Sequence, residues 1–327
     1  MNNGRVEAGE PIASECLVSV VMATYNSLRT IDRAIDSVFA QTHANWQLVI
    51  VDDASDDETP KRVIERQRKL EDRIVFVRGH RNAGPAKARN RGLALSRGEW
   101  IAILDADDAW RPDRLKLLVA EALRVGADAA CDNLLGFDDH LNEETVPLFA
   151  HLPDLVTLID AVAAEYAGMY NLGYLKPIVR RAFLDAHGIR YEERLRTGED
   201  LLFLLTILVW GAKVTCLDRP GYIYTTPVGS ASGRLSKSTN TSPRDTELSR
   251  SLMKLRDGNQ IKLSDHERRA INERILFLDG IAPLSDFRHA RLQGDWLRVL
   301  QLVVTSQRVR QRIWQVLTMR SAVRDGP

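Results

Sequence analysis

Runs of consecutive apolar residues alternate with amphipathic segments along the first 124 residues. The runs are short and rich in residues that favour β-structure, which is typical of buried parallel strands. They predict strands at 17–23, 47–51, 74–78 and 100–104. Helical spacing and helix-start residues predict helices at 30–41, 59–70, 86–96 and 112–124. Strands that alternate with helices indicate βαβ units, so we predict an α/β domain whose mostly parallel sheet is flanked by helices.

The pattern changes beyond this region. Residues 127–227 are mixed, with a predicted short strand at Met169–Tyr174 and a predicted helix after Asp200. The chain is then polar and loop-like up to Arg244, and 245–324 has a helical pattern. The predicted organisation is therefore a disordered N-terminal tail (1–16), an α/β domain (17–230) and a loop with a helical C-terminal unit (231–327).

Composition excludes several classes of protein. The chain has 327 residues, 44% of them hydrophobic, which is enough for one large domain and an appendage. Its 45 basic and 44 acidic residues nominate no nucleic acid as a partner. Segment 1–15 lacks the apolar core of a signal peptide, and Leu201–Trp210 is much shorter than the ~20 residues of a spanning helix. Three widely spaced cysteines predict packed thiols in a reducing, cytoplasmic compartment rather than a zinc site or disulfides.

Polar residues follow three of the predicted strands at the point where each strand ends. These clusters are 24–27, 52–55 and 105–108. In open α/β sheets, ligands bind at the carboxyl ends of the strands. We therefore expect the three clusters to converge on one cleft.

The strongest local signal is Asp105-Ala106-Asp107 after the fourth strand. Alternate carboxylates at a strand end can hold a hard divalent cation such as Mg²⁺ or Mn²⁺, which would neutralise the phosphates of a leaving nucleotide. Asp108 adds a third carboxylate. The alternative is that these aspartates cap the next helix by accepting hydrogen bonds from free backbone amides.

Five motifs in a fixed order extend this signal. They are VSVVMATYN (18–26), VIVDDAS (49–55), NAGPAKARN (82–90), ILDADD (103–108) and GED (198–200). Together they resemble glycosyltransferase family 2, the inverting enzymes of the GT-A fold, over about residues 17–230. The resemblance implies a Rossmann-like fold and Mn²⁺- or Mg²⁺-dependent transfer of a sugar from a nucleotide diphosphate, with a UDP-sugar as the expected donor. The expected acceptor is a hydroxyl of a saccharide or of a lipid-linked molecule in polysaccharide or glycolipid assembly.

The resemblance also assigns roles on the nucleoside side. It implies that the loop after the first strand, Ala23, Thr24, Tyr25 and Asn26, contacts the nucleoside; Ala23 stands where the family often has proline. Tyr25 could stack on the base or simply pack against the fold. Asp53 matches the family carboxylate that accepts a hydrogen bond from uracil N3–H, while Asp52 supports the loop.

Further roles follow on the phosphate and acceptor sides. Asn82, Gly84, Lys87 and Arg89 begin a helix whose N-terminus suits phosphates, although Lys87 could be only a solvated lysine. The resemblance implies that Arg89 bridges the nucleotide and the aspartates, and that Asp105 and Ala106 contact the donor. Asp105 and Asp107 are the expected metal ligands.

Asp200 matches the family's catalytic base, with Glu199 as its neighbour and reserve candidate. The base takes the proton of the acceptor hydroxyl during a single in-line displacement. The alternative is that both acids only favour the start of a helix. No histidine lies between His187 and His266, so a third metal ligand from the loop near Gly229 is doubtful; this loop could close over the nucleotide through backbone groups or Arg234.

The C-terminal segment Arg288–Pro327 is cationic, with interleaved apolar residues. Such a helix can lie on an anionic membrane surface, here the inner face of the cell membrane. The alternative is a helix packed on the catalytic domain or on a second subunit, with solvated arginines.

Two other functions remain open at this point. A nucleotidyltransferase-like enzyme would share the sheet and the metal carboxylates, whereas no GxGxxG or GxxxxGK[ST] loop supports a dehydrogenase or a P-loop enzyme. A nucleotide-sugar-binding scaffold without turnover is the non-enzymatic alternative, which the acids Asp105, Asp107 and Asp200 disfavour.

Overall fold

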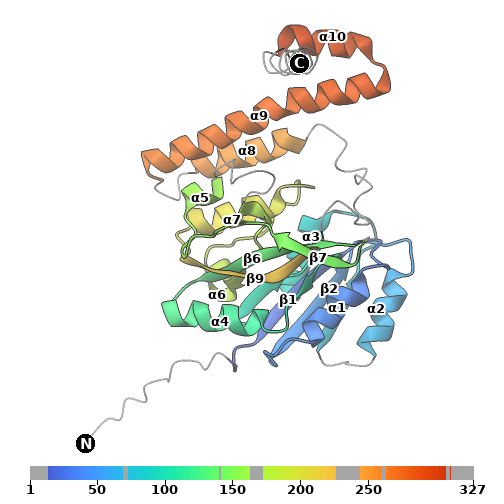
Figure 1. Ribbon diagram of the computed structural model, residues 1–327, viewed down its shortest axis with the longest axis vertical. Helices are drawn as coiled ribbons and strands as arrows, with labels where there is room; N and C mark the ends of the chain where they lie inside the picture. Colours follow the sequence, from blue (N-terminus) through green and yellow to red (C-terminus); the bar gives the residue numbers. More distant parts are fainter. Residues whose placement is uncertain are drawn as a thin grey trace, which may run out of the picture.

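The protein is described by a computed structural model that covers residues 14–68, 73–139, 141–162, 172–225, 244–258, 263–306 and 310. Figure 1 shows a twisted sheet with helices on both faces and a stack of C-terminal helices beyond one side of it. The predicted tail lies outside the described residues up to residue 13.

The first half of the domain alternates strands and helices, as predicted. Its elements are β1 (Val18–Thr24), α1 (Ile31–Phe39), β2 (Trp46–Asp52), α2 (Thr59–Gln67), β3 (Ile74–Arg78), α3 (Pro85–Leu95) and β4 (Trp100–Ile103). The strands are parallel in the order β3-β2-β1-β4. Every residue of β2 is buried because helices cover both faces of the sheet, which explains its nearly continuous apolar sequence.

The second half extends this sheet with mixed strand directions. Its elements are β5 (Ala109–Trp110), α4 (Arg114–Val125), β6 (Ala129–Asp138), β7 (Glu143–Pro147), α5 (Leu158–Val162), η1 (Leu172–Tyr174), β8 (Ile178–Arg180), α6 (Arg181–Ala186), α7 (Glu199–Val209) and β9 (Val214–Thr225). Strand β8 joins β4 to β6 with antiparallel pairing on both sides, and β6 pairs parallel with β9. The sheet is thus parallel in its first half and mixed in its second.

The strand predicted at Met169–Tyr174 is wrong in its described part. Residues 172–174 form the 3₁₀ turn η1, and 169–171 lie outside the described residues. The backbone N–H of Leu175 donates to the carbonyl of Leu172 at 3.0 Å. This hydrogen bond is local, and the buried Leu172 packs beneath α7 instead of joining a strand ladder.

Three helices follow the α/β domain: α8 (Arg244–Asp257), α9 (Asp265–Gln293) and α10 (Trp296–Thr305). Helix α9 begins at a capping box in which Ser264 and Glu267 satisfy each other's backbone amides. Helix α8 packs between α9 and α7, and α10 folds back on α9 (Figure 1). Leu248 and Leu252 of α8 belong to the same buried cluster as the sheet residues, so the helical unit shares the core of the domain.

Helix α7 explains the longest apolar stretch of the sequence. Nearly all of its side chains are buried because it lies between the sheet and the C-terminal helices. Within the described part of the chain, no helix has both the length and the hydropathy needed to cross a membrane.

Candidate active site

Two cavities meet at the carboxyl ends of β1 and β4. One, of about 290 Å³, is lined by the loop after β1, the start of α3 and residues 105–107. The other, of about 450 Å³, is lined by the start of α7, the segment after η1, and helices α8 and α9. Arg89 and Asp105 line both cavities, so these two residues mark the boundary between them.

The smaller cavity contains most of the residues predicted to contact the nucleoside. Ala23, Tyr25 and Asn26 line it, whereas Thr24 is buried behind them. The Tyr25 side chain is 46% exposed, which leaves its ring face available to a ligand rather than packed in the core. Asn26 has a positive φ of 51° and accepts a hydrogen bond from the Asp56 amide at 3.0 Å, so it fixes the shape of this wall.

Asp53 lines neither of these cavities. Its carboxylate accepts hydrogen bonds from the backbone amides of Ala83 at 2.9 Å and Gly84 at 2.7 Å, and thereby holds the turn that starts α3. Asp52 supports the loop after β2, as expected, because its carboxylate accepts from the amide of Ser55 at 3.1 Å. A contact between Asp53 and uracil stays a prediction.

The turn before α3 is shaped by a glycine and an arginine. Gly84 has φ of 100°, and a Cβ there would lie 2.6 Å from Arg196 Nη1. Arg196 donates to the Asn82 side chain at 2.9 Å, so the predicted residues Asn82 and Gly84 position this arginine at the larger cavity. Lys87 is 53% exposed and lies 3.8 Å from Glu193, away from both cavities. Its placement matches the solvated alternative.

Arg89 contacts three carboxylates of the site. Its buried guanidinium is 2.6 Å from Asp105 Oδ1, 2.7 Å from Glu199 Oε1 and 3.5 Å from Asp200 Oδ1. Burial lowers the pKa of Arg89, but the charges of Asp200, Asp105 and Glu199 outweigh it and raise the pKa well above its usual value. Arg89 therefore stays charged and joins the end of β4 to the start of α7.

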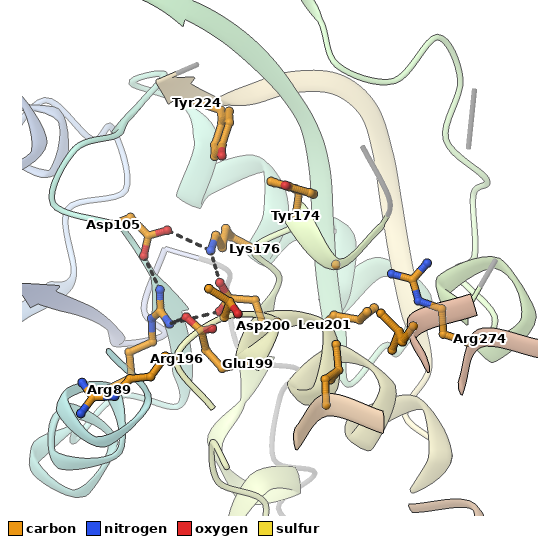
Figure 2. Close-up of a pocket in the computed structure, with 15 residues that line it drawn as sticks. Arg89, Asp105, Tyr174, Lys176, Arg196, Glu199, Asp200, Leu201, Tyr224 and Arg274 are labelled. Atoms are coloured by element: carbon orange, nitrogen blue, oxygen red, sulfur yellow. Dashed lines mark hydrogen bonds and ion pairs between the residues drawn. The ribbon is translucent and has the colours of Figure 1, made fainter. Parts of the chain in front are cut away.

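Lys176 is a central residue that sequence reasoning missed. Its ammonium lies 2.9 Å from Asp105 Oδ2 and also forms an ion pair with Asp200 Oδ2. Figure 2 shows Lys176 between these two carboxylates, with Arg89 on the other side of them. The segment of mixed pattern around Lys176 carried no signal, since a single lysine before a proline is unremarkable in sequence.

The three aspartates after β4 have different surroundings. Burial raises the pKa of Asp105, but Lys176 and Arg89 outweigh it and lower the pKa well below its usual value. Burial and the neighbouring Asp105 raise the pKa of Asp107. Asp108 points away from the other two, since it accepts hydrogen bonds from the Tyr222 hydroxyl at 2.7 Å and the Thr225 amide at 2.8 Å. It is a structural residue and not a third carboxylate of the cleft.

The helix-capping alternative for these aspartates does not hold, because β5 follows Asp108 and α4 begins only at Arg114. For Glu199 and Asp200 the alternative is partly right. Both stand in the first turn of α7, yet both also pair with Arg89. Trp110, which follows these aspartates on β5, is buried, and the Arg114 guanidinium lies over its ring.

The acids fit a divalent cation in one respect. Asp107 forms no ion pair among the described residues, and the positive charges of Lys176 and Arg33 only partly offset the effects of burial and of Asp105 on its pKa. Asp105 and Asp107 supply the oxygen donors that hard cations prefer. No group of three His, Cys, Asp or Glu side chains within the described ranges could hold a metal ion without help. A bound ion would therefore need further ligands, such as phosphate oxygens of a donor.

The larger cavity combines carboxylates with aromatic and apolar walls. Tyr174 and Tyr224 meet edge to face, with ring centroids 5.6 Å apart. Leu248 of α8 and Arg274 and Leu278 of α9 form the opposite wall. The loop near Gly229, with Arg234, lies outside the described residues.

Comparisons with known proteins agree with this architecture. Residues 19–187 match the family model of Glycosyl transferase family 2. The succinoglycan biosynthesis protein ExoO of Rhizobium meliloti is 40% identical over 220 residues, which cover 66% of this chain and 62% of ExoO. The putative teichuronic acid biosynthesis glycosyltransferase TuaG of Bacillus subtilis is 30% identical over 197 residues, covering 60% of this chain and 73% of TuaG.

The matched region is a part of these relatives: this chain spans 62% and 64% of the lengths of ExoO and its fellow succinoglycan protein ExoU. Among solved structures, S. aureus TarS 1–349 in complex with UDP-GlcNAc superposes with a TM-score of 0.63 and 20% identity, over 87% of this chain and 90% of TarS 1–349. This likeness confirms the predicted GT-A fold. By its family match and its ordered motifs, this chain belongs to glycosyl transferase family 2.

Proposed function

We propose that this protein transfers a sugar from a nucleoside diphosphate, of the UDP-sugar class, to an acceptor hydroxyl with inversion at the anomeric carbon. One observation carries the proposal: Asp105, which lines both cavities, and Asp200, which lines the larger one, share the cations Arg89 and Lys176. A donor in the first cavity and an acceptor in the second would meet at this boundary. TarS has been solved with UDP and with UDP-GlcNAc, which supports the donor class.

The proposed reaction needs one base. Asp200 accepts the proton of the acceptor hydroxyl while that oxygen forms a bond to the anomeric carbon and the bond from this carbon to the diphosphate oxygen breaks. Attack from the side opposite the leaving group inverts the configuration. A Mn²⁺ or Mg²⁺ ion held by Asp107 and Asp105 would supply positive charge to the departing diphosphate. Arg89, at the boundary of the two cavities, adds a fixed positive charge beside the same diphosphate.

The acceptor side is assigned to the larger cavity. The Tyr174 and Tyr224 rings offer faces and edges that suit the C–H surfaces of a sugar, and α8 and α9 close the cavity with leucines. A saccharide or lipid-linked acceptor fits these walls. The names of ExoO and TuaG place those proteins in succinoglycan and teichuronic acid biosynthesis, which supports polysaccharide assembly as the setting.

The metal assignment is tested by nucleotide binding. We expect Mn²⁺ or Mg²⁺ to strengthen UDP binding to the wild-type protein, and Asp107→Asn to weaken this metal-dependent part ~10–100-fold, since even outer partners of a metal have effects of that size. Isothermal titration with UDP, with and without each metal, measures the difference. Asp36→Asn on α1 is the control, because its side chain is 58% exposed and remote from the cleft. Metal-enhanced binding that is equal in both variants would reject Asp107 as a ligand.

We also propose that α10 contacts an anionic membrane surface. One stripe of this helix carries Trp296, Leu297, Leu300 and Val304, each more than 60% exposed. Arg291, Arg298 and Arg310 are exposed around it, opposed by Asp295 at the helix start. An apolar stripe flanked by arginines is complementary to anionic headgroups above an acyl interior. Such a contact would bring the enzyme to lipid-linked acceptors.

Vesicle sedimentation tests this surface. The wild-type protein should bind phosphatidylglycerol vesicles and bind phosphatidylcholine vesicles much less, and Leu297→Glu/Leu300→Glu should lose most of the binding because two charges would enter the acyl boundary. Val146→Glu on β7 is the matched control, since Val146 is a similarly exposed apolar residue at 71%. If the double variant still binds the vesicles, α10 is not the membrane contact. If the substitutions leave vesicle binding unchanged and dissociate a dimer in light scattering, a second copy of the chain covers α10 instead.

A further inference from the structure

Lys176 occupies a position that none of the assigned roles explains. It lies in the short segment between η1 and β8 and is 7% exposed. Its ammonium contacts Asp105 on the donor side and Asp200 on the acceptor side, through the Oδ2 atom of each carboxylate. Burying an ammonium is costly unless it is paired. Here both of its partners, Asp105 and Asp200, have a role in the proposed reaction, and Figure 2 shows the ion pairs that join them to Lys176.

The backbone of Lys176 is held as firmly as its side chain. Its carbonyl accepts a hydrogen bond from Arg114 Nη2 at 2.8 Å. The Arg114 side chain is fully buried and pairs with Asp132 on β6, also at 2.8 Å. The backbone of Lys176 is therefore anchored to the sheet and α4 and not to α7, which carries Asp200.

The charge balance gives this lysine a specific task. Asp105, Glu199 and Asp200 bring three negative charges around Arg89, and Lys176 is the second cation of the cluster. Without it, Asp105 and Asp200 would face each other across the cavity boundary with only Arg89 between them. Like charges at short range in a poorly hydrated site repel strongly, so the Asp200 side chain would turn toward solvent in the larger cavity.

We infer that Lys176 is a positioning residue that holds the Asp200 carboxylate at a set place relative to Asp105, and thus relative to the anomeric carbon of a bound donor. The inference rests on the proposed function. It predicts that Lys176 acts on the acceptor side through Asp200, with whose carboxylate its ammonium forms an ion pair. Displacing a reacting group by about 1 Å can reduce a rate ~10²-fold.

The experiment measures UDP release from UDP-glucose and UDP-GlcNAc, with water or an added acceptor, for the full chain. Lys176→Met should lower kcat ~10²-fold while the KM for the donor changes much less. Lys176→Arg should recover part of kcat because the charge is retained, and a short alkylamine should partly restore Lys176→Ala by filling the vacated place with an ammonium. Lys61→Met on α2, 73% exposed, is the matched control and should match the wild type.

A double-mutant cycle separates positioning from mere folding. Adding Lys176→Met to Asp200→Asn should cause no further loss of kcat, because the residue through which Lys176 acts is already disabled. If the losses of kcat in the two single variants multiply in the double variant, the inference is overturned. An unchanged kcat in Lys176→Met would overturn it as well. Should Lys176→Met fail to fold, lack of recovery in Lys176→Arg and in amine-treated Lys176→Ala would overturn it instead. A wild-type protein that releases no UDP from any donor contradicts the proposed function itself, which is a different result.

Discussion

Replacing Asp200 by Asn is expected to lower kcat by ~10²–10⁴-fold, the usual contribution of a general base. Asparagine keeps the size of the side chain and can still accept a hydrogen bond from Lys176, but its amide takes no proton from a hydroxyl. Arg89 retains its contacts with Asp105 and Glu199, so the cluster should stay folded. Affinity for UDP should be preserved, because Asp200 lines only the larger cavity.

The neighbouring acid makes this test decisive. Glu199 is 2.7 Å from Arg89 and is the reserve candidate for the base. We expect Glu199→Gln to lose less activity than Asp200→Asn, since the Glu199 carboxylate is committed to Arg89 while Asp200 lies 3.5 Å from it. Initial rates of UDP release and UDP titrations on both variants give the comparison. The reverse order would transfer the role of base to Glu199, and full activity in both would remove it from this helix.

Replacing Arg114 by Met is expected to lower the free energy of unfolding by ~3–5 kcal/mol, the cost of leaving one partner of a buried ion pair uncompensated. The Arg114 side chain is 0% exposed and Asp132 is 4% exposed. Three hydrogen bonds at 2.8–3.1 Å join them. The guanidinium also lies over the rings of Trp110 and Tyr222, at 4.8 and 5.1 Å. Urea unfolding measures the loss.

Helix α4 supplies a control for this prediction. Arg124 also pairs with a carboxylate, Glu121, but its side chain is 69% exposed, so Arg124→Met should change stability little. Arg114→Met/Asp132→Leu should recover much of the loss, because it removes the stranded charge. Equal effects of Arg114→Met and Arg124→Met would contradict the assignment.

The stability of Arg114→Met should also depend on pH. Burial raises the pKa of Asp132, and in the wild type Arg114 opposes this. In the variant the folded state binds a proton that the unfolded state releases near its ordinary pKa of ~3.9. The contribution of Asp132 to the free energy of unfolding is therefore largest below the unfolded-state pKa and falls as pH rises toward the raised pKa of the folded state. The difference from the wild type should be smaller at pH 4 than at pH 7.

The local sequence pattern was sufficient to predict an element wherever residues that are neighbours in the sequence are buried in the same way. The apolar runs at 17–23 and 47–51 became β1 and β2, because strands buried on both faces need unbroken apolar sequence. Asp105 and Asp200 were both nominated from motifs, and the structure brings them to one cation cluster. Parallel strands end at the same edge of the sheet, which is why such clusters could be expected to meet.

Side-chain direction was not predictable in this way. Asp107 and Asp108 are adjacent in sequence, yet only Asp107 lines the cleft, because Asp108 is taken by the Tyr222 hydroxyl. Asp53 likewise points into the turn before α3. Each outcome depends on a partner at least 30 residues away in the chain. Sequence spacing does not report such partners.

The amino-acid sequence by itself determined the α/β alternation, the cleft-forming edge of the sheet and the acids that stand there, because these depend on periodicity and on residues next to one another. Tertiary structure alone decided that Lys176 joins Asp105 to Asp200, that Arg114 and Asp132 anchor it, and that α8 and α9 wall the larger cavity. The physical reason is that buried charges are stabilised by partners gathered through folding from distant segments, and no local pattern records which partners those will be.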